Sequence, residues 1–79
     1  MRKYYISISG TARRMLRKQC PQFYERYKDV LEKMYEVRAE NGNTAKRLFK
    51  EQYREAAVFK AAARLLRITF LETLRAYPG

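Results

Sequence analysis

The amino-acid sequence predicts a mainly α-helical fold, all-α apart from a short N-terminal strand or extended segment. A short helix and then a long antiparallel helical hairpin are expected to follow, with the chain forming a dimer. Alternation of apolar and polar side chains is confined to residues 3–9, whereas later segments have helical spacing. Glycine and proline occur only at positions 10, 21, 42, 78 and 79. At 79 residues the chain is one small domain that buries only about 60% of its unfolded surface, which favours self-association.

The N-terminal stretch from Lys3 to Ser9 has the pattern of a short strand. Tyr4, Ile6 and Ile8 would share one side of this strand. Because no later segment offers a second strand, it must pair with a second copy of the chain or with the sheet of a partner protein, unless it is not a strand. We therefore expect Tyr4, Ile6 and Ile8 to lie in an oligomer or partner interface.

Three helices are expected after this segment. Ser9 or Thr11 can cap the first helix, which must stop before Pro21, and proline suits the first position of the second. Asn41-Gly42 ends the second helix, and no helix breaker then appears before the final Pro-Gly. Within the single domain 1–79, the predicted elements are an extended segment at 3–9 and helices at 11–19, 21–40 and 44–77.

The third predicted helix buries one stripe of side chains against the second. At about 100° per residue, the stripe spans roughly 120° of the helix, as a hairpin with a short loop requires. A further apolar side is left uncovered, so we expect it to meet a second copy or another protein. The buried stripe comprises Leu48, Ala56, Phe59, Ala62, Ala63, Leu66, Phe70, Leu74 and Tyr77. The further side comprises Val58, Ala61, Leu65 and Ile68.

Positive charge is concentrated towards the two ends of the chain. Eighteen Lys and Arg against eight Asp and Glu give a net charge of +10, and residues 1–20 carry no acid. On the third predicted helix the Lys and Arg side chains share an arc of about 100° without an acid, which favours contact with a phosphate backbone over a merely solvated face. Tyr53 lies in this arc, where its ring can stack on an unpaired nucleobase. The arc comprises Lys46, Lys50, Tyr53, Lys60, Arg64, Arg67 and Arg75.

Four further bases crowd the first predicted helix, and they have two alternative interpretations. The free N–H groups of the helix start, together with Arg13 and Arg14, would form a phosphate cradle. Alternatively, the four bases cover apolar surface with their stems and pair with acids of the second helix. The four are Arg13, Arg14, Arg17 and Lys18.

Residue types needed for catalysis are scarce. Histidine is absent, Cys20 is the only cysteine, and neither a nucleophile motif nor a glycine-rich phosphate loop occurs. We therefore expect no enzyme, no cofactor, no metal site and no small-molecule substrate. No apolar run is long enough for a signal peptide or a membrane span, which predicts a cytoplasmic protein without a membrane partner.

The order of an alternating strand, a short helix and a second helix over residues 3–37 resembles the ribbon-helix-helix DNA-binding proteins. In that family two chains pair their strands and lay the resulting ribbon in a major groove. The resemblance implies that Lys3, Tyr5 and Ser7 face the bases, while the apolar side chains of the strand face the dimer core.

The charge pattern and the uncovered apolar side lead to two alternative functions. The first is a small basic nucleic-acid-binding accessory or regulatory protein, preferring DNA to RNA, of the kind carried by phages and mobile elements. The second is a non-enzymatic interaction module, an inhibitor or adaptor that docks on an acidic protein through its apolar side or its strand edge. Salt-dependent binding of nucleic acid distinguishes the first function from the second.

Overall fold

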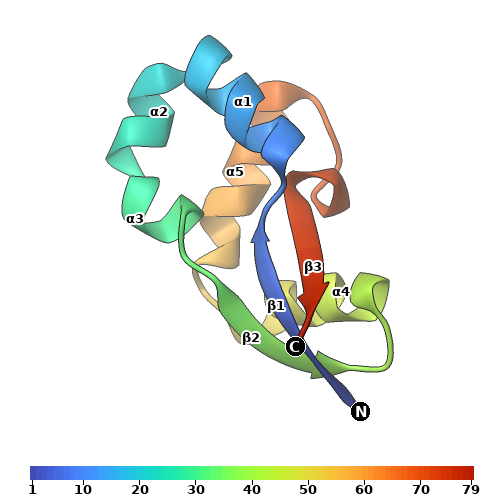
Figure 1. Cartoon of the computed structure of the whole chain (residues 1–79). Coiled ribbons are helices and arrows are strands. Elements are labelled where there is room, and N and C mark those ends of the chain that lie inside the picture. The colour runs from blue at the N-terminus through green and yellow to red at the C-terminus, as the bar shows by residue number, and fades with distance from the viewer.

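The computed structural model describes every residue, Met1–Gly79, and shows an α/β fold with five short α-helices and one antiparallel sheet of three strands (Figure 1). The prediction of a mainly α-helical hairpin is therefore wrong. In chain order the elements are β1 (Arg2–Ile8), α1 (Gly10–Gln19), α2 (Pro21–Arg26), α3 (Lys28–Leu31), β2 (Tyr35–Ala39), α4 (Gly42–Gln52), α5 (Ala56–Leu66), the 3-10 helix η1 (Leu71–Thr73) and β3 (Leu74–Pro78).

Strand β1 is the middle strand of the sheet, whose order is β2-β1-β3. It runs antiparallel to both neighbours, so that Tyr5 lies opposite Glu36 on one side and opposite Tyr77 on the other. Both edges of β1 are thus paired within one chain, and the expected pairing with a second copy or a partner's sheet is wrong. The dimeric ribbon implied by the resemblance to ribbon-helix-helix proteins is also overturned, because β1 has no free edge with which to form it.

Alternating side chains of β1 and β2 separate onto the two faces of the sheet. Tyr4, Ile6 and Ile8 are buried in the core of the chain itself, which corrects their assignment to an interface. Tyr35 and Val37 of β2 are buried beside them, although helical spacing predicts both on the second helix. An alternation of only five residues fits either a strand or one side of a helix, and pairing with β1 decides for the strand.

The helix predicted at 21–40 contains two short helices and a strand. Helix α2 begins with Pro21 in its first turn, where a missing N–H costs nothing. The backbone leaves helical geometry at Tyr27, and α3 then ends at Leu31. The Tyr35 hydroxyl donates a hydrogen bond of 2.8 Å to the carbonyl of Val30, which ties the end of α3 to β2.

The helix predicted at 44–77 is broken into α4, α5, η1 and β3. The first break comes at Tyr53, whose backbone is extended (φ −123°, ψ 127°) and whose hydroxyl donates a hydrogen bond of 2.7 Å to the Glu36 carbonyl of β2. The second break comes at Arg67, which adopts the left-handed conformation (φ 58°, ψ 43°). Glycine usually occupies such a helix end, so an arginine there leaves no signal in the sequence.

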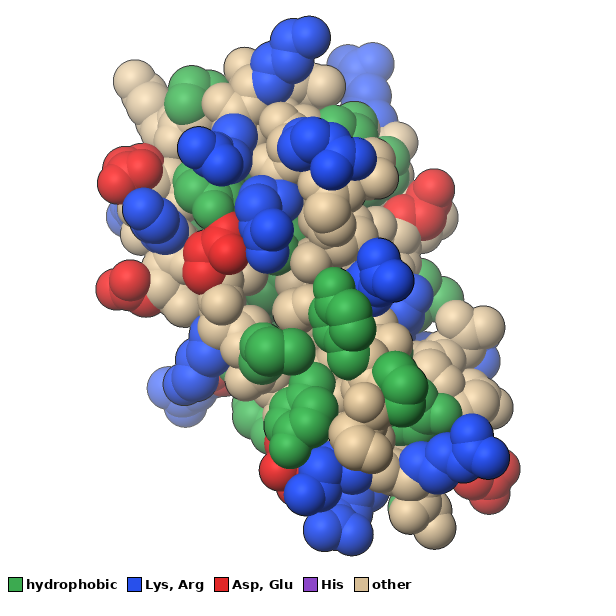
Figure 2. All heavy atoms as spheres, in the orientation of Figure 1, with side chains coloured by type: hydrophobic (Ala, Val, Ile, Leu, Met, Phe, Trp, Pro, Cys, Tyr) green, Lys and Arg blue, Asp and Glu red, His purple; other side chains and the backbone are tan.

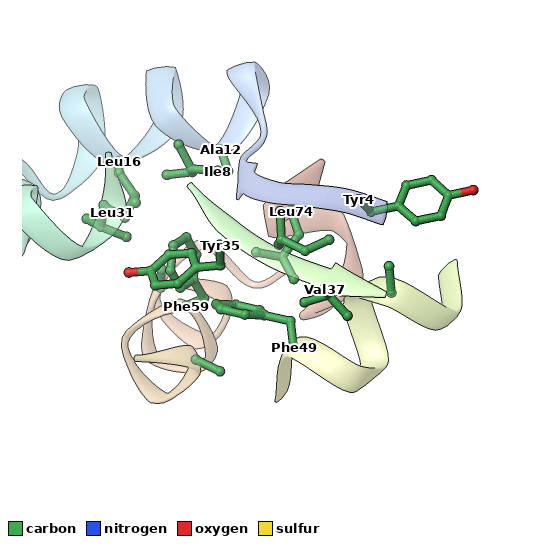
Figure 3. Packing of buried hydrophobic residues seen from close by; sticks show 14 of the residues in the cluster. Tyr4, Ile8, Ala12, Leu16, Leu31, Tyr35, Val37, Phe49, Phe59 and Leu74 are labelled. Carbon is green, nitrogen blue, oxygen red and sulfur yellow. The ribbon is translucent and has the colours of Figure 1, made fainter. Parts of the chain in front are cut away.

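Helix α4 packs on one face of the sheet and places Phe49 at the centre of the core (Figure 3). Phe49 is fully buried, and its ring centre lies 4.9 Å from that of Tyr35 and 5.4 Å from that of Phe59 in α5. Burial raises the pKa of Tyr35 from its ordinary value near 10 to about 12. Helix α1 closes the core beyond the end of β1 with Ala12 and Leu16.

Ser9 connects the start of α1 to the segment that precedes β3. Its hydroxyl accepts a hydrogen bond of 3.1 Å from the Ala12 N–H and donates one of 3.0 Å to the Glu72 carbonyl. The Ser9 N–H donates to the Thr73 carbonyl at 2.8 Å. The Glu72 carboxylate in turn accepts a hydrogen bond from the Thr69 N–H at 2.9 Å, and this bond lowers the pKa of Glu72.

Replacing Ser9 with alanine is expected to lower the free energy of unfolding by about 1 kcal/mol, because the variant loses the helix cap and the bond to Glu72. Urea denaturation of the wild-type protein and the variant measures this loss. Thr11→Ala is the matched control, since Thr11 is exposed and the cap of α1 is Ser9. A larger loss for Thr11→Ala than for Ser9→Ala would contradict the assignment of the cap.

Candidate nucleic-acid interface

Almost all the positive charge of the protein lies unpaired at its surface (Figure 2). Among eighteen Lys and Arg side chains, only Arg13 forms an ion pair, in which its Nε lies 3.0 Å from a carboxylate oxygen of Glu32. The other bases have no acid close enough to neutralise them within the chain. A surface of this kind attracts polyanions, since each contact with a phosphate releases condensed counterions.

The four bases of α1 divide between their two interpretations. Arg13 neutralises Glu32, which also accepts a hydrogen bond from the Tyr24 hydroxyl. Burial and this hydrogen bond raise the pKa of Tyr24. The Arg17 guanidinium lies 5.8 Å from the centre of the Tyr24 ring, and Arg14, Arg17 and Lys18 are all exposed. Arg13 and Arg17 thus contact the following helices, while Arg14 and Lys18 have no such contact and are free to meet an anion.

Three of the predicted bases meet in one depression between α4 and α5. Lys60 and Arg64 are four residues apart on α5 and therefore share one side of it, while Lys50 reaches the same depression from α4. The Lys50 amino group lies 6.0 Å from the centre of the Phe70 ring, in a cation–π contact. No acid lines this depression. We call it the basic groove, and its lining residues are Lys50, Lys60, Ala63, Arg64, Ile68 and Phe70.

Phe70 and Lys50 also line a second depression, which contains a base that the sequence analysis missed. Arg47 precedes Lys50 by one helical turn on α4 and borders this depression together with Glu51 and Thr69. The spacing of three residues between Arg47 and Lys50 indicates that both side chains lie on one side of a helix. The sequence analysis left Arg47 out of the basic arc because it assumed one continuous helix over residues 44–77, and the structure contains no such helix.

The remaining members of the predicted arc are dispersed, so the single basic arc is corrected along with the helix that carried it. Lys46 borders a depression at the start of α1, Arg67 is exposed at the end of α5, and Arg75 belongs to β3. Tyr53 is held by its hydrogen bond to Glu36, and its ring packs 5.2 Å from a buried ring of β2. Of the predicted arc, the structure therefore brings together only Lys50, Lys60 and Arg64, which line the basic groove.

The further apolar side predicted for the third helix is also divided. Leu65 is 48% exposed and borders a depression with Phe23, at the junction of α1 and α2. Val58, Ala61 and Ile68 are only half-buried, and Ile68 belongs to the basic groove. Leu65 is therefore the member of this set that stands out at the surface.

The face of the sheet turned away from α4 carries exposed charged and aromatic side chains (Figures 1 and 2). Tyr77 on this face is 40% exposed. The strand pattern already placed Tyr5 on the outward side of β1, but Tyr77 was missed because residue 77 was assigned to a helix. We call this surface the open sheet face, and it comprises Lys3, Tyr5, Glu36, Arg38, Arg75 and Tyr77, whereas Ser7 on the same side of β1 is buried.

The structure contains neither a cluster of metal-ligating side chains nor a membrane-spanning helix. No three His, Cys, Asp or Glu residues lie close enough together to hold a metal ion. None of the helices combines the length and the apolar character needed to cross a membrane. No family model, curated protein or solved structure matches the chain.

Proposed function

We propose that the protein binds nucleic acid through the basic groove. The observation that supports this function is the convergence of Lys50, Lys60 and Arg64, from two helices, on one depression that no acid lines. Like charges gathered on a small domain repel one another and destabilise the folded state. A bound polyanion relieves this repulsion, and the regularly spaced phosphates of a nucleic acid suit a row of bases.

Neighbouring bases enlarge the surface that a phosphate backbone would follow. Arg47 adds a fourth base on the other side of Phe70. Four phosphate contacts predict that log affinity falls against log salt concentration with a slope of roughly −3 to −4. Duplex DNA is the ligand we place first, because its two backbones carry one negative charge per about 1.7 Å of axis.

Charge reversal in the basic groove tests this function. Lys60→Glu combined with Arg64→Glu is expected to weaken binding of a short DNA duplex by at least about tenfold and to make the salt slope shallower by about 2. Fluorescence anisotropy at several salt concentrations measures both quantities. Arg26→Glu combined with Lys28→Glu is the matched control, since it changes the net charge equally on α2 and α3. Binding that is insensitive to salt, or equally weakened by both double variants, would overturn the proposal.

The exposure of Leu65 favours a second candidate function, a non-enzymatic interaction module that docks on an acidic protein. Leu65 is 48% exposed beside the half-buried Phe23, and such an apolar spot can insert into a partner. The excess of positive charge would steer an acidic partner toward the protein. This candidate gains support if the wild-type protein shows no salt-dependent binding of nucleic acid.

A further inference from the structure

Two tyrosine residues occupy directly opposite positions on the open sheet face. Tyr5 of β1 and Tyr77 of β3 are direct partners in the antiparallel register, so their side chains leave the sheet on the same face. The Cβ atoms of such a pair are about 4.5–5.5 Å apart. Tyr77 is 40% exposed and Tyr5 is half-buried, and no helix passes over this face of the sheet (Figure 1).

Neighbouring groups hold each of the two rings in position. A Cβ atom at Gly79 would lie 3.0 Å from Cε2 of Tyr5, which shows that the backbone there lies against the Tyr5 side chain. The Arg75 guanidinium lies 5.0 Å from the centre of the Tyr77 ring, in a cation–π contact along the same strand. Rings that are positioned before binding lose less conformational freedom when a ligand stacks on them.

Positive charge flanks the tyrosine pair at both ends. Lys3 and Arg38 are partners across β1 and β2 at one end, and Arg75 lies at the other end, toward α1. None of these three basic side chains forms an ion pair, and Glu36 is the one acidic side chain on the open sheet face. Figure 2 shows hydrophobic side chains gathered over the sheet, with Lys and Arg side chains around them.

Flat aromatic surface between cations suits one kind of occupant. A second copy of the chain would bring Lys3, Arg38 and Arg75 against the same charges, which disfavours self-association through this face. A duplex keeps the faces of its nucleobases stacked inside, whereas a single strand offers nucleobases for stacking and phosphates for the flanking cations. We propose that the open sheet face binds single-stranded nucleic acid, with one nucleobase stacked on Tyr5 and the next on Tyr77.

This inference adds a second binding surface to the proposed function. It rests on that function only in taking nucleic acid as the ligand, because the open sheet face and the basic groove are different surfaces. The basic groove is formed by α4 and α5, and α4 covers the opposite face of the sheet. Variants of one surface are therefore expected to leave binding at the other intact. The two proposals can consequently fail separately.

Paired tyrosine variants test the stacking directly. Y5L combined with Y77L is expected to weaken binding of a single-stranded oligothymidylate of about twelve nucleotides by roughly 25-fold, at about fivefold for each lost stack. Y5F combined with Y77F keeps both rings and should bind as the wild-type protein does. Y27L is the matched control, because it removes an aromatic side chain from the turn between α2 and α3. Fluorescence anisotropy measures all four affinities, with thermal denaturation as the check on folding.

Two further measurements keep the test decisive if the leucine variant does not fold. Ultraviolet cross-linking of oligothymidylate to the wild-type protein should place adducts on Tyr5 and Tyr77. The K60E/R64E variant should still bind the single strand and form the same adducts, even where it has lost the duplex. Duplex binding unaffected by K60E/R64E would contradict the basic groove alone and would leave the stacking site supported by its own adducts.

Three results would overturn the stacking site. The first is a folded Y5L/Y77L variant that binds the single strand as tightly as the wild-type protein. The second is cross-linking confined to residues of the basic groove. The third is a wild-type protein that binds no single strand at all, a result that leaves an acidic protein as the alternative occupant of the open sheet face.

Discussion

Phe49→Ala is expected to lower the free energy of unfolding by about 3–5 kcal/mol. Phe49 is fully buried, and its ring lies 4.9 Å from Tyr35, 5.4 Å from Phe59 and 6.3 Å from Phe70, measured between ring centres. Alanine leaves a cavity where these three rings meet, and the surrounding strands and helices can fill it only in part. A domain of this size has a total stability of roughly 4–12 kcal/mol, so the variant keeps little of it.

Leu48→Ala is the comparison that gives this measurement its meaning. Leu48 precedes Phe49 on α4 and is only half-buried, so its loss is expected to cost less. A helical hairpin predicts the reverse order, because Leu48 belongs to the buried stripe of that fold and Phe49 does not. Urea denaturation of both variants decides between the α/β fold and the helical hairpin. A greater loss of unfolding free energy for Leu48→Ala would contradict the packing of α4 on the sheet.

Removal of residues 74–79 is expected to abolish cooperative unfolding of the domain. Strand β3 contributes five residue pairs to β1 and the buried side chain of Leu74, which lies opposite Ile8. Without β3 the sheet is reduced to a two-stranded hairpin, and such hairpins are marginally stable in water. Thermal denaturation followed by circular dichroism measures the loss of the transition.

Deletion of Gly79 alone is the control for this truncation. It removes one backbone hydrogen bond, of 2.8 Å, to the Lys3 carbonyl, and should cost about 1 kcal/mol. The helical hairpin makes a different prediction for residues 74–79, because only the last turns of a long helix would be lost. A truncated chain that still melts cooperatively near the wild-type temperature would contradict the three-stranded sheet.

The sequence could predict the part of the basic groove whose basic side chains lie close together along the chain. Lys60 and Arg64 share a side of α5 as they would share a side of any longer helix, because spacing by four residues depends only on local geometry. Lys50 joins them because the chain turns between α4 and α5, at a position with neither glycine nor proline. Tyr77 meets Tyr5 through the register of β1 and β3, which unites opposite ends of the chain.

The sequence by itself determined the features that rest on contacts between near neighbours. The alternation around Ile6 marks the strand β1, the Ser9 hydroxyl caps α1, and Pro21 opens α2. The chain breaks at Asn41-Gly42 where the sequence places a break, but the break separates a strand from a helix rather than two helices, and the Asn41 side chain caps α4 by accepting a hydrogen bond of 2.9 Å from the Thr44 N–H. Each of these features depends on residues only a few positions apart.

Only the tertiary structure decided that residues 35–39 and 74–78 are strands and that one long helix is two. A helix satisfies its backbone N–H and C=O groups within its own segment, whereas a strand needs a partner elsewhere in the chain. Both five-residue segments find that partner in β1. The end of α4 is likewise held by a bond between distant residues, from the Tyr53 hydroxyl to the Glu36 carbonyl. Local spacing contains no information on such pairings, and they determine which face of the sheet stays uncovered.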